Sequence, residues 1–345
     1  MSIKYNGGVL PTVGADGTTL VANSSASTGV SWAGPIVTAG KNALINGGMD
    51  IWQRGTSSTS NLAYIADRWF QYTSAGTTTF SRESTIVPTG SQYSMKIAQA
   101  SASAVITVNQ AIETFNAIQF AGQTVNVSMM CYASASTGMQ IQVQYSTSVD
   151  NGTLGTWTAI TASSGGAATV TNAWQKMTGT YAIPSTAKSI YISLFIPTLT
   201  ATTNAYFGQA QLELGSVPTA FSRAGGTLSG ELTACQRYYR RFTAGGAAPY
   251  WRIAIGQNLN TTQSQFVFPL GSSMRAVPSF NASGSFTLRQ GDTSLGTNAP
   301  TLQGDGSTQD FVGLVVGMSG GTTGYGCYLR SENNTSTYLE FSAEL

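Results

Sequence analysis

Several stretches of the chain alternate between apolar and polar residues, which is typical of β-strands with one buried and one wet face. Over Met139–Tyr145, apolar residues alternate with three glutamines. The same period of two recurs over 125–132 and 190–196, and a shorter version covers 93–97. Turn-forming clusters of Gly, Ser, Asn and Pro separate these stretches. Many short antiparallel strands over residues 41–224 predict a jelly-roll sandwich, in which the best helical stretch is Gln110–Gln119.

A second β region follows a short helix. Ser229 is expected to cap a helix that runs through Glu231 toward Arg237. Beyond it the β pattern resumes, so residues 225–345 are predicted to form a smaller β domain. Its Phe311–Val316 stretch is apolar on both faces. Such a strand lies either centrally in a two-sided core or at a subunit interface.

Residues 1–40 do not resemble a core-forming segment. They are small and polar with isolated apolar positions, and alone they could not offset the entropy of ordering. We expect an extended arm that orders against another chain, with a flexible linker as the alternative.

The charge content is low, with 16 Lys and Arg against 14 Asp and Glu in 345 residues and a net charge of +2. Ser and Thr number 86, so the surface is expected to be hydrated through hydroxyls and amides rather than through ions. The excess of positive charge is too small to predict binding to nucleic acid or to an anionic membrane. No apolar run reaches the roughly 18 residues of a membrane span, and no secretory start is visible. We therefore expect synthesis in a cytoplasm without membrane insertion.

Histidine is absent, which excludes Ser-His-Asp and Cys-His catalysis and every His-containing metal site. The three cysteines, Cys131, Cys235 and Cys327, are far apart and form no C-x-x-C pair. We expect them to be reduced and buried rather than redox-active or zinc-binding.

Carboxylates are then the remaining catalytic option, as in glycoside hydrolysis. The candidates are Asp50, Asp67, Glu83, Asp292, Asp305 and Asp310. Asp50 lies near Arg54 and Asp67 precedes Arg68, so we expect structural ion pairs there and no catalytic residue. Asp292, Asp305 and Asp310 sit among Gly, Ser and Thr, so we expect solvated loops there. A calcium ion is conceivable among their oxygens, but the chain has no D-x-D-x-D-G motif, so no metal or cofactor is assigned.

Aromatic residues offer a binding chemistry. A flat ring stacks on the apolar face of a sugar, and neighbouring amides form hydrogen bonds with the sugar hydroxyls. Trp157, Trp174 and Tyr72 lie near expected loops or strand ends and are the candidate carbohydrate-binding residues. A core position remains the alternative for each of them.

A local concentration of cations and rings covers Cys235–Phe242. Its few arginines are not enough to bind the phosphate backbone of a nucleic acid. We expect Arg237, Tyr238 and Tyr239 to form a buried element between the two domains, because Arg and Tyr suit desolvated interfaces.

Together, several segments resemble a domain recurrent in tailed-bacteriophage tail-fibre and related virion proteins. They are Asn42–Gly55 (NALINGGMDIWQRG), Ala66–Trp69 (ADRW), Gln209–Phe221 (QAQLELGSVPTAF), Glu231–Tyr239 (ELTACQRYY) and the ending Tyr338–Leu345. The arm over Gly17–Trp32 is similar to segments found upstream of fibre modules. The resemblance covers nearly the whole chain.

The resemblance implies a carbohydrate-binding-module-like (galactose-binding-like) jelly roll followed by a small β domain, in a homotrimeric virion appendage. The expected function is a structural tail fibre that contacts host surface glycans and joins other virion proteins through residues 1–40. One alternative is a capsid-attached fibre or decoration protein that binds no sugar. A second alternative is a polysaccharide depolymerase, although an enzyme is not expected.

Overall fold

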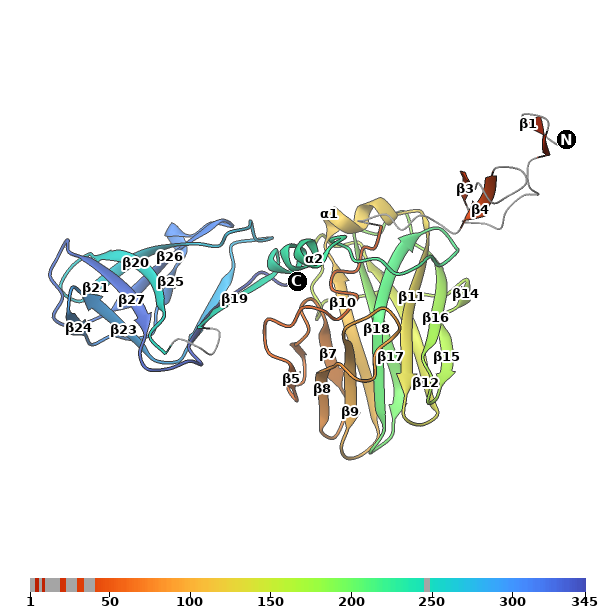
Figure 1. Cartoon of the computed structure of the whole chain (residues 1–345), viewed down its shortest axis with the longest axis horizontal. Helices are drawn as coiled ribbons and strands as arrows, with labels where there is room; N and C mark the ends of the chain where they lie inside the picture. Colours follow the sequence, from red (N-terminus) through yellow and green to blue (C-terminus); the bar gives the residue numbers. More distant parts are fainter. Residues whose placement is uncertain (1–3, 6–7, 10–18, 23–29, 34–40, 245–248) are drawn as a thin grey trace. The chain divides into compact units, whose positions relative to one another are not determined.

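The computed structural model describes residues 4–5, 8–9, 19–22, 30–33, 41–244 and 249–345 (Figure 1). Contacts divide the chain into a first unit, Met1–Glu231 with Leu345, and a second unit, Leu232–Glu344. The division lies slightly beyond the boundary expected after residue 224. Both units are built from antiparallel strands, so the predicted all-β class is confirmed.

Two seven-stranded sheets form the first unit. Sheet 1 has the order β13 (Thr158–Ile160), β12 (Thr137–Ser146), β17 (Ser189–Leu199), β10 (Ala104–Ile112), β7 (Phe70–Thr73) and β6 (Ala63–Tyr64), and β15 (Ala167–Val170) also pairs with β12. Sheet 2 has the order β14 (Ser164–Gly165), β16 (Gln175–Ala182), β11 (Thr124–Ala133), β18 (Asn204–Leu214), β9 (Ser94–Gln99), β8 (Thr78–Glu83) and β5 (Ser57–Ser58).

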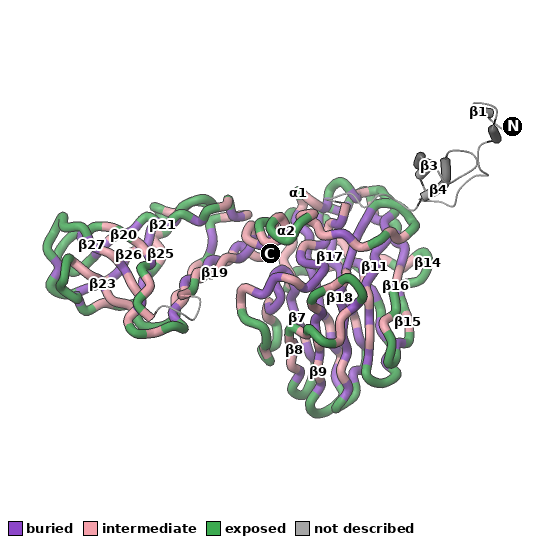
Figure 2. The backbone as a smooth tube through the Cα atoms, in the orientation of Figure 1, coloured by how far each residue is buried: buried purple, intermediate pink, exposed green. Residues whose placement is uncertain are grey.

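The two sheets share one apolar core (Figure 2). Sheet 2 contributes alternate residues of β11, including Val125, Val127 and Met129, all fully buried. Sheet 1 contributes alternate residues of β17 and β12, such as Ile192 and Ile141. Two antiparallel sheets packed on a common core form the expected jelly roll.

A hydrogen bond across the core ties the two sheets together. The Tyr181 hydroxyl of β16 donates to the carbonyl of Ile141 in β12 over 2.7 Å. That carbonyl lies on the edge of β12 between the segment paired with β13 and the segment paired with β15. Burial raises the pKa of Tyr181 to about 12, so the phenol keeps its proton.

The N-G-x-x-D-I-W motif owes its compactness to Asn46. Its side-chain oxygen accepts hydrogen bonds from the backbone N–H groups of Asp50 and Ile51, each over 2.9 Å. Its amide nitrogen donates to the carbonyls of Ile51 and Asp67 over 2.8 and 3.0 Å. Asn46 has a φ of 58°, a left-handed conformation that asparagine tolerates better than most residues. One buried amide therefore folds the loop around itself.

The helices differ from the expectation. Gln110–Gln119 is not one helix, because its start belongs to β10 and only α1 (Thr114–Ala117) and the 3-10 turn η1 (Ile118–Phe120) are helical. The linking helix α2 spans Leu228–Gln236. Ser229 lies inside this helix, and the hydroxyl of Thr227 accepts the N–H of Gly230 over 3.1 Å instead.

The second unit contains two sheets. Sheet 3 has the order β24 (Thr293–Leu295), β23 (Phe286–Gln290), β27 (Gly326–Ser331), β20 (Arg252–Asn258), β21 (Gln263–Pro269), β26 (Phe311–Gly317) and β25 (Thr301–Gln303). Sheet 4 has the order β19 (Tyr239–Thr243), β28 (Tyr338–Ser342) and β22 (Ser279–Ser283), and η2 covers Gly304–Gly306. The apolar strand β26 lies between β21 and β25, with Val312, Leu314 and Val316 in the core.

Within residues 1–40, the described segments form two short antiparallel pairs. β1 (Lys4–Tyr5) pairs with β2 (Gly8–Val9), and β3 (Thr19–Ala22) pairs with β4 (Val30–Ala33). The rest of the predicted arm lies outside the described residues. The three cysteines are buried, as expected.

Tyr181→Phe is predicted to destabilise the first unit by about 1–2 kcal/mol, because it leaves the buried carbonyl of Ile141 without its donor. Chemical denaturation should report this loss. Tyr145→Phe is the matched control, since the Tyr145 ring also packs against the core but its hydroxyl has no such bond. Equal stability of Tyr181→Phe and Tyr145→Phe would mean that the inter-sheet bond contributes nothing.

Candidate functional site

The outer face of sheet 1 carries aromatic and amide side chains. On β17 the residues Ile190, Ile192 and Leu194 belong to the core, so Tyr191 and Ser193 between them face the other side. Phe195 continues that outer row and is half-buried. The alternation that builds the core thus also fixes which side chains face outward.

Strand register arranges the outer face in three rows. One row runs Tyr72, Thr107, Phe195, Gln140 and Ala167. The next runs Tyr64, Phe70, Asn109, Ser193 and Gln142, and the third runs Ala111, Tyr191, Gln144 and Ala159. Asn109 and Ser193 are buried and form the floor between the larger side chains.

Two pairs of aromatic rings lie on this face. Trp157 stacks on Tyr191 with ring centroids 4.8 Å apart, and its indole N–H donates to the carbonyl of Gly152 over 3.1 Å. Tyr64 packs edge-on against Phe70 at 5.3 Å. Burial, followed by the nearby Tyr64, raises the pKa of Tyr191, so its phenol remains neutral.

The structure brings two of the three predicted carbohydrate-binding residues together. Tyr72 and Trp157 share the outer face of sheet 1. Trp174 lies elsewhere, against Tyr132 of sheet 2 at 5.7 Å. The positions of these residues along the chain do not reveal which sheet each one joins, because strand pairing determines it.

Three glutamines of β12 were not predicted as part of the site. Gln140 is exposed, and Gln142 and Gln144 are half-buried. They line a hollow of about 420 Å³ together with small residues, including Ala159, Ala162 and Gly165. Their alternation with apolar residues was visible in the sequence, but a solvated strand face gives the same pattern.

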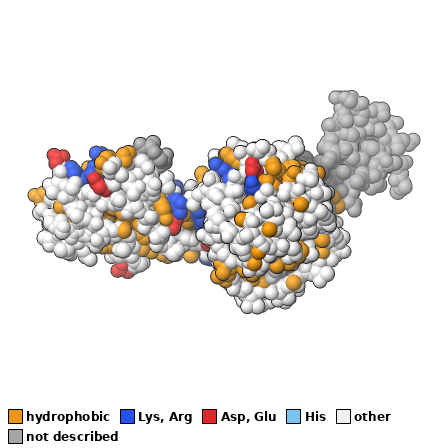
Figure 3. Space-filling model, turned by 90° about the horizontal axis from the view of Figure 1, so that it is seen from below, with side chains coloured by type: hydrophobic (Ala, Val, Ile, Leu, Met, Phe, Trp, Pro, Cys, Tyr) orange, Lys and Arg blue, Asp and Glu red, His pale blue; other side chains and the backbone are white. Residues whose placement is uncertain are grey.

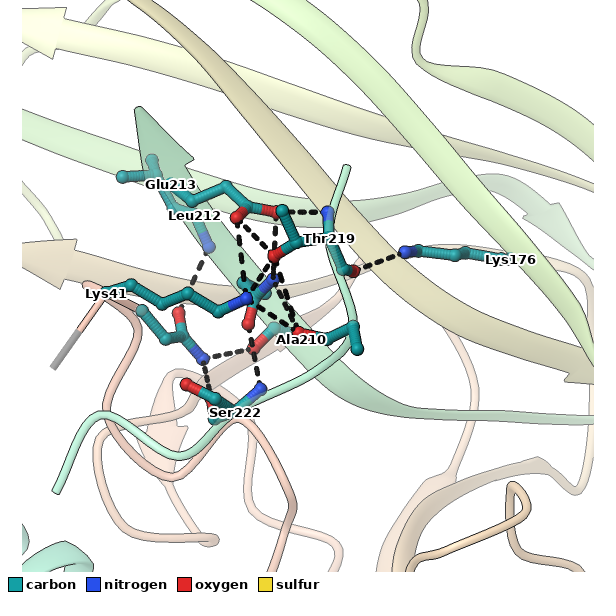
Figure 4. A network of polar contacts seen from close by, with 10 residues as sticks. Lys41, Lys176, Ala210, Leu212, Glu213, Thr219 and Ser222 are labelled. Carbon is teal, nitrogen blue, oxygen red and sulfur yellow. Dashed lines mark hydrogen bonds and ion pairs between the residues drawn. The ribbon is translucent and has the colours of Figure 1, made fainter. Parts of the chain in front are cut away.

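Part of the outer face of sheet 2 is covered by its own chain (Figure 4). The Glu213 carboxylate accepts the N–H of Thr219 over 2.8 Å and its hydroxyl over 2.5 Å. Lys41 donates to the carbonyl of Ala220 over 2.9 Å, and Lys176 to that of Thr219 over 2.8 Å. These contacts hold the segment after β18 against sheet 2. Glu213 is therefore buried, whereas Gln140, Gln142 and Gln144 of β12 stay at least partly exposed.

The ion pairs near the N-G-x-x-D motif form across the fold. Asp50 pairs with Arg223 over 2.8 Å, not with its sequence neighbour Arg54. Arg54 lies 3.9 Å from Asp67. Arg68 is buried and donates to the carbonyl of Ala111 over 2.6 Å. These acids support the loop rather than face one another as a pair.

Glu231 is a further buried acid that sequence patterns did not single out. Its carboxylate accepts the backbone N–H groups of Asn46 and of Gly225, the latter over 2.7 Å. Burial raises the pKa of Glu231, and the two N–H groups act in the opposite direction. The contacts place this acid in a structural position between two loops.

The Arg-Tyr cluster belongs to the second unit. Tyr238 and Tyr239 are buried there, and the Tyr239 hydroxyl donates to Glu340 over 2.5 Å. The carbonyl of Arg237 accepts the N–H of Arg275 over 2.7 Å. An inter-domain role for Arg237, Tyr238 and Tyr239 stays a prediction.

Within the described part of the chain, His, Cys, Asp and Glu residues form no group of three or more that could hold a metal ion. In the same part, no helix has the length and apolarity needed to cross a membrane.

No family model and no curated protein matches the chain. Solved structures show distant similarity to about half of it. A Bacteroides thetaiotaomicron protein, provisionally described as sugar-binding, has a TM-score of 0.36 and 12% identity over 50% of this chain and 100% of its own. TmCBM61, solved with β-1,4-galactotriose, has a TM-score of 0.33 and 12% identity over 50% of this chain and 99% of its own. The enzymatically active domain of tailspike protein 4 from bacteriophage CBA120 has a TM-score of 0.35 and 14% identity over 53% of this chain, but only 22% of its own.

Proposed function

We propose that the first unit binds glycans on the outer face of sheet 1. The supporting observation is the register that places Tyr72, Phe195 and Gln140 in one row. Rings can stack on the apolar faces of sugars, while amides and hydroxyls bond to sugar hydroxyls. The Trp157–Tyr191 stack adds a second aromatic platform beside Gln144.

Tyr72→Ala and Trp157→Ala are each predicted to lower glycan affinity about tenfold, because each removes an aromatic contact. Binding of the full chain to a glycan array, followed by titration calorimetry on the best hit, measures this loss. Trp174→Ala is the matched control, since that ring lies on sheet 2. Thermal unfolding checks that all three variants remain folded.

Equal losses in all three variants would contradict a site on sheet 1.

The same samples also test the alternative of a polysaccharide depolymerase. Release of reducing ends or a fall in polymer size, abolished by a single Asp→Asn substitution, would favour the enzyme and overturn a purely binding function.

We further propose that the protein is a structural part of a bacteriophage virion, acting as a tail fibre in host attachment. The support is the resemblance of the Asn42–Gly55, Ala66–Trp69 and Glu231–Tyr239 segments to virion appendage proteins. Many copies on one particle would turn weak glycan contacts into firm adhesion through avidity. A capsid-attached fibre or decoration protein is the alternative on the same resemblance.

Deletion of residues 1–40 is predicted to leave a folded protein that no longer joins virions, because this segment is proposed to contact other virion proteins. The measurement is the amount of truncated protein in purified particles made by a complemented deletion phage. Incorporation at the level of the full chain would refute the attachment role.

Self-association is proposed through sheet 3. Its strands expose large apolar side chains on one side: Ile255 is 82% exposed, Val267 66% and Phe311 51%. Exposed apolar groups gathered on one sheet often mark an interface. A homotrimer would cover this face with other copies of the chain.

Light scattering is predicted to give three times 36.0 kDa for the wild type and a smaller mass for Ile255→Lys/Val267→Lys, because desolvating two charges in an apolar contact is costly. Val277→Lys is the control, since Val277 is similarly exposed at 51% but lies outside the strands of sheet 3. A monomeric wild type at micromolar concentration would contradict the trimer.

A further inference from the structure

The glutamines of β12 differ from most other strand glutamines of the first unit, although the exposed Gln175 of β16 also has no side-chain hydrogen bond. Gln110 exchanges two hydrogen bonds with the backbone of Ile45, each over 2.8 Å. Gln99 and Gln211 likewise use their amides inside the fold. Among the described residues, Gln140, Gln142 and Gln144 have no side-chain hydrogen bond within the chain. Their amides are left for a ligand.

The side-chain amides of Gln140, Gln142 and Gln144 form a row along β12, here called the glutamine ladder. Alternate residues of a strand face the same side, so neighbouring glutamines are separated by about 7 Å along β12. The ladder then extends over about 13 Å, which is longer than one sugar ring. The adjoining hollow of about 420 Å³ is bordered by Ala159, Ala162 and Gly165, whose small side chains leave room beside it. A ligand that uses all three amides must be an elongated chain.

The outer face also restricts the charge of the ligand. The three rows consist of aromatic, amide, hydroxyl and alanine side chains, without a Lys, Arg, Asp or Glu. Arg54 lies 5.1 Å from the Tyr64 ring at the far end, but its charge is directed to Asp67 at 3.9 Å. Figure 3 shows a first-unit surface with few charged side chains. A carboxylate or sulfate on this face would lose water without gaining a cation, which is costly.

Amides and hydroxyls match each other chemically. A glutamine amide both donates and accepts hydrogen bonds, and so does each sugar hydroxyl. An anionic group only accepts, so it would leave the amide oxygens of the ladder without a donor.

We infer that the ligand is an uncharged, extended polysaccharide chain lying along β12, with Gln140, Gln142 and Gln144 as the residues that determine specificity. This inference rests on the proposed glycan binding and adds to it the ligand class and the direction of binding.

The test uses the full chain against immobilised neutral polysaccharides (xylan, galactan, mannan and dextran) and anionic ones (alginate, polygalacturonate and heparin). We expect binding to at least one neutral polymer, with less than about a twofold change between 50 and 500 mM NaCl, because exposed charges alone are strongly screened. Soluble hexasaccharides of that polymer should bind more tightly than disaccharides.

Gln142→Ala is expected to lower the affinity about fivefold to tenfold, and Gln142→Glu at least as much, since the first removes the amide and the second replaces its donor by a charge. Gln123→Ala, at an exposed loop position, is the matched control and should bind like the wild type.

The outcomes separate the inference from the proposed function. Neutral binding that is lost in Tyr72→Ala but unchanged in Gln142→Ala would overturn the ladder and leave glycan binding intact. Binding confined to anionic polymers and lost at 500 mM NaCl would overturn the neutral class. No binding to any polymer would overturn the inference and the proposed function together.

Discussion

The period of two along β17 is the constraint on which the site depends. This strand pairs with β10 on one edge and β12 on the other, and its isoleucines and Leu194 pack into the shared core. Because alternate residues point to opposite faces, burial of one set fixes Tyr191, Ser193 and Phe195 on the outer face. A slip by one residue would bury the polar set, so core packing enforces the register of the surface as well.

The few charged residues of the first unit form ion pairs with structural roles. Asp50 is engaged by Arg223, Asp67 by Arg54 and Glu213 by Lys41. These pairs hold loops and the segment after β18 in place. The charges therefore stabilise connections, while the exposed side of sheet 1 carries uncharged groups. Under the proposed function, recognition would rely on ring stacking and neutral hydrogen bonds, which depend little on ionic strength.

Strand patterns made the fold class and the core residues predictable, because period-two burial is a local property. The same approach was only partly right for Gln110–Gln119: its helical turns begin at Thr114, because pairing of β10 with β17 overrides local helix preference up to Ile112. It failed for the partner of Asp50, which lies 173 residues away. Tyr72 and Trp157 could be proposed from residue type, but their separation from Trp174 required the sheet register. The glutamines of β12 gained meaning only beside Tyr191 and Phe195.

The proposed recognition chemistry and the proposed self-association depend on each other. Each neutral hydrogen bond to a sugar replaces one to water, so its net contribution is small, about 1 kcal/mol. A single uncharged face of this kind binds weakly and releases quickly. Multiplying the face by assembling copies through sheet 3 raises the effective concentration of free faces near a surface polymer. Weak, reversible contacts on each copy would then combine into lasting attachment without requiring any one site to be tight.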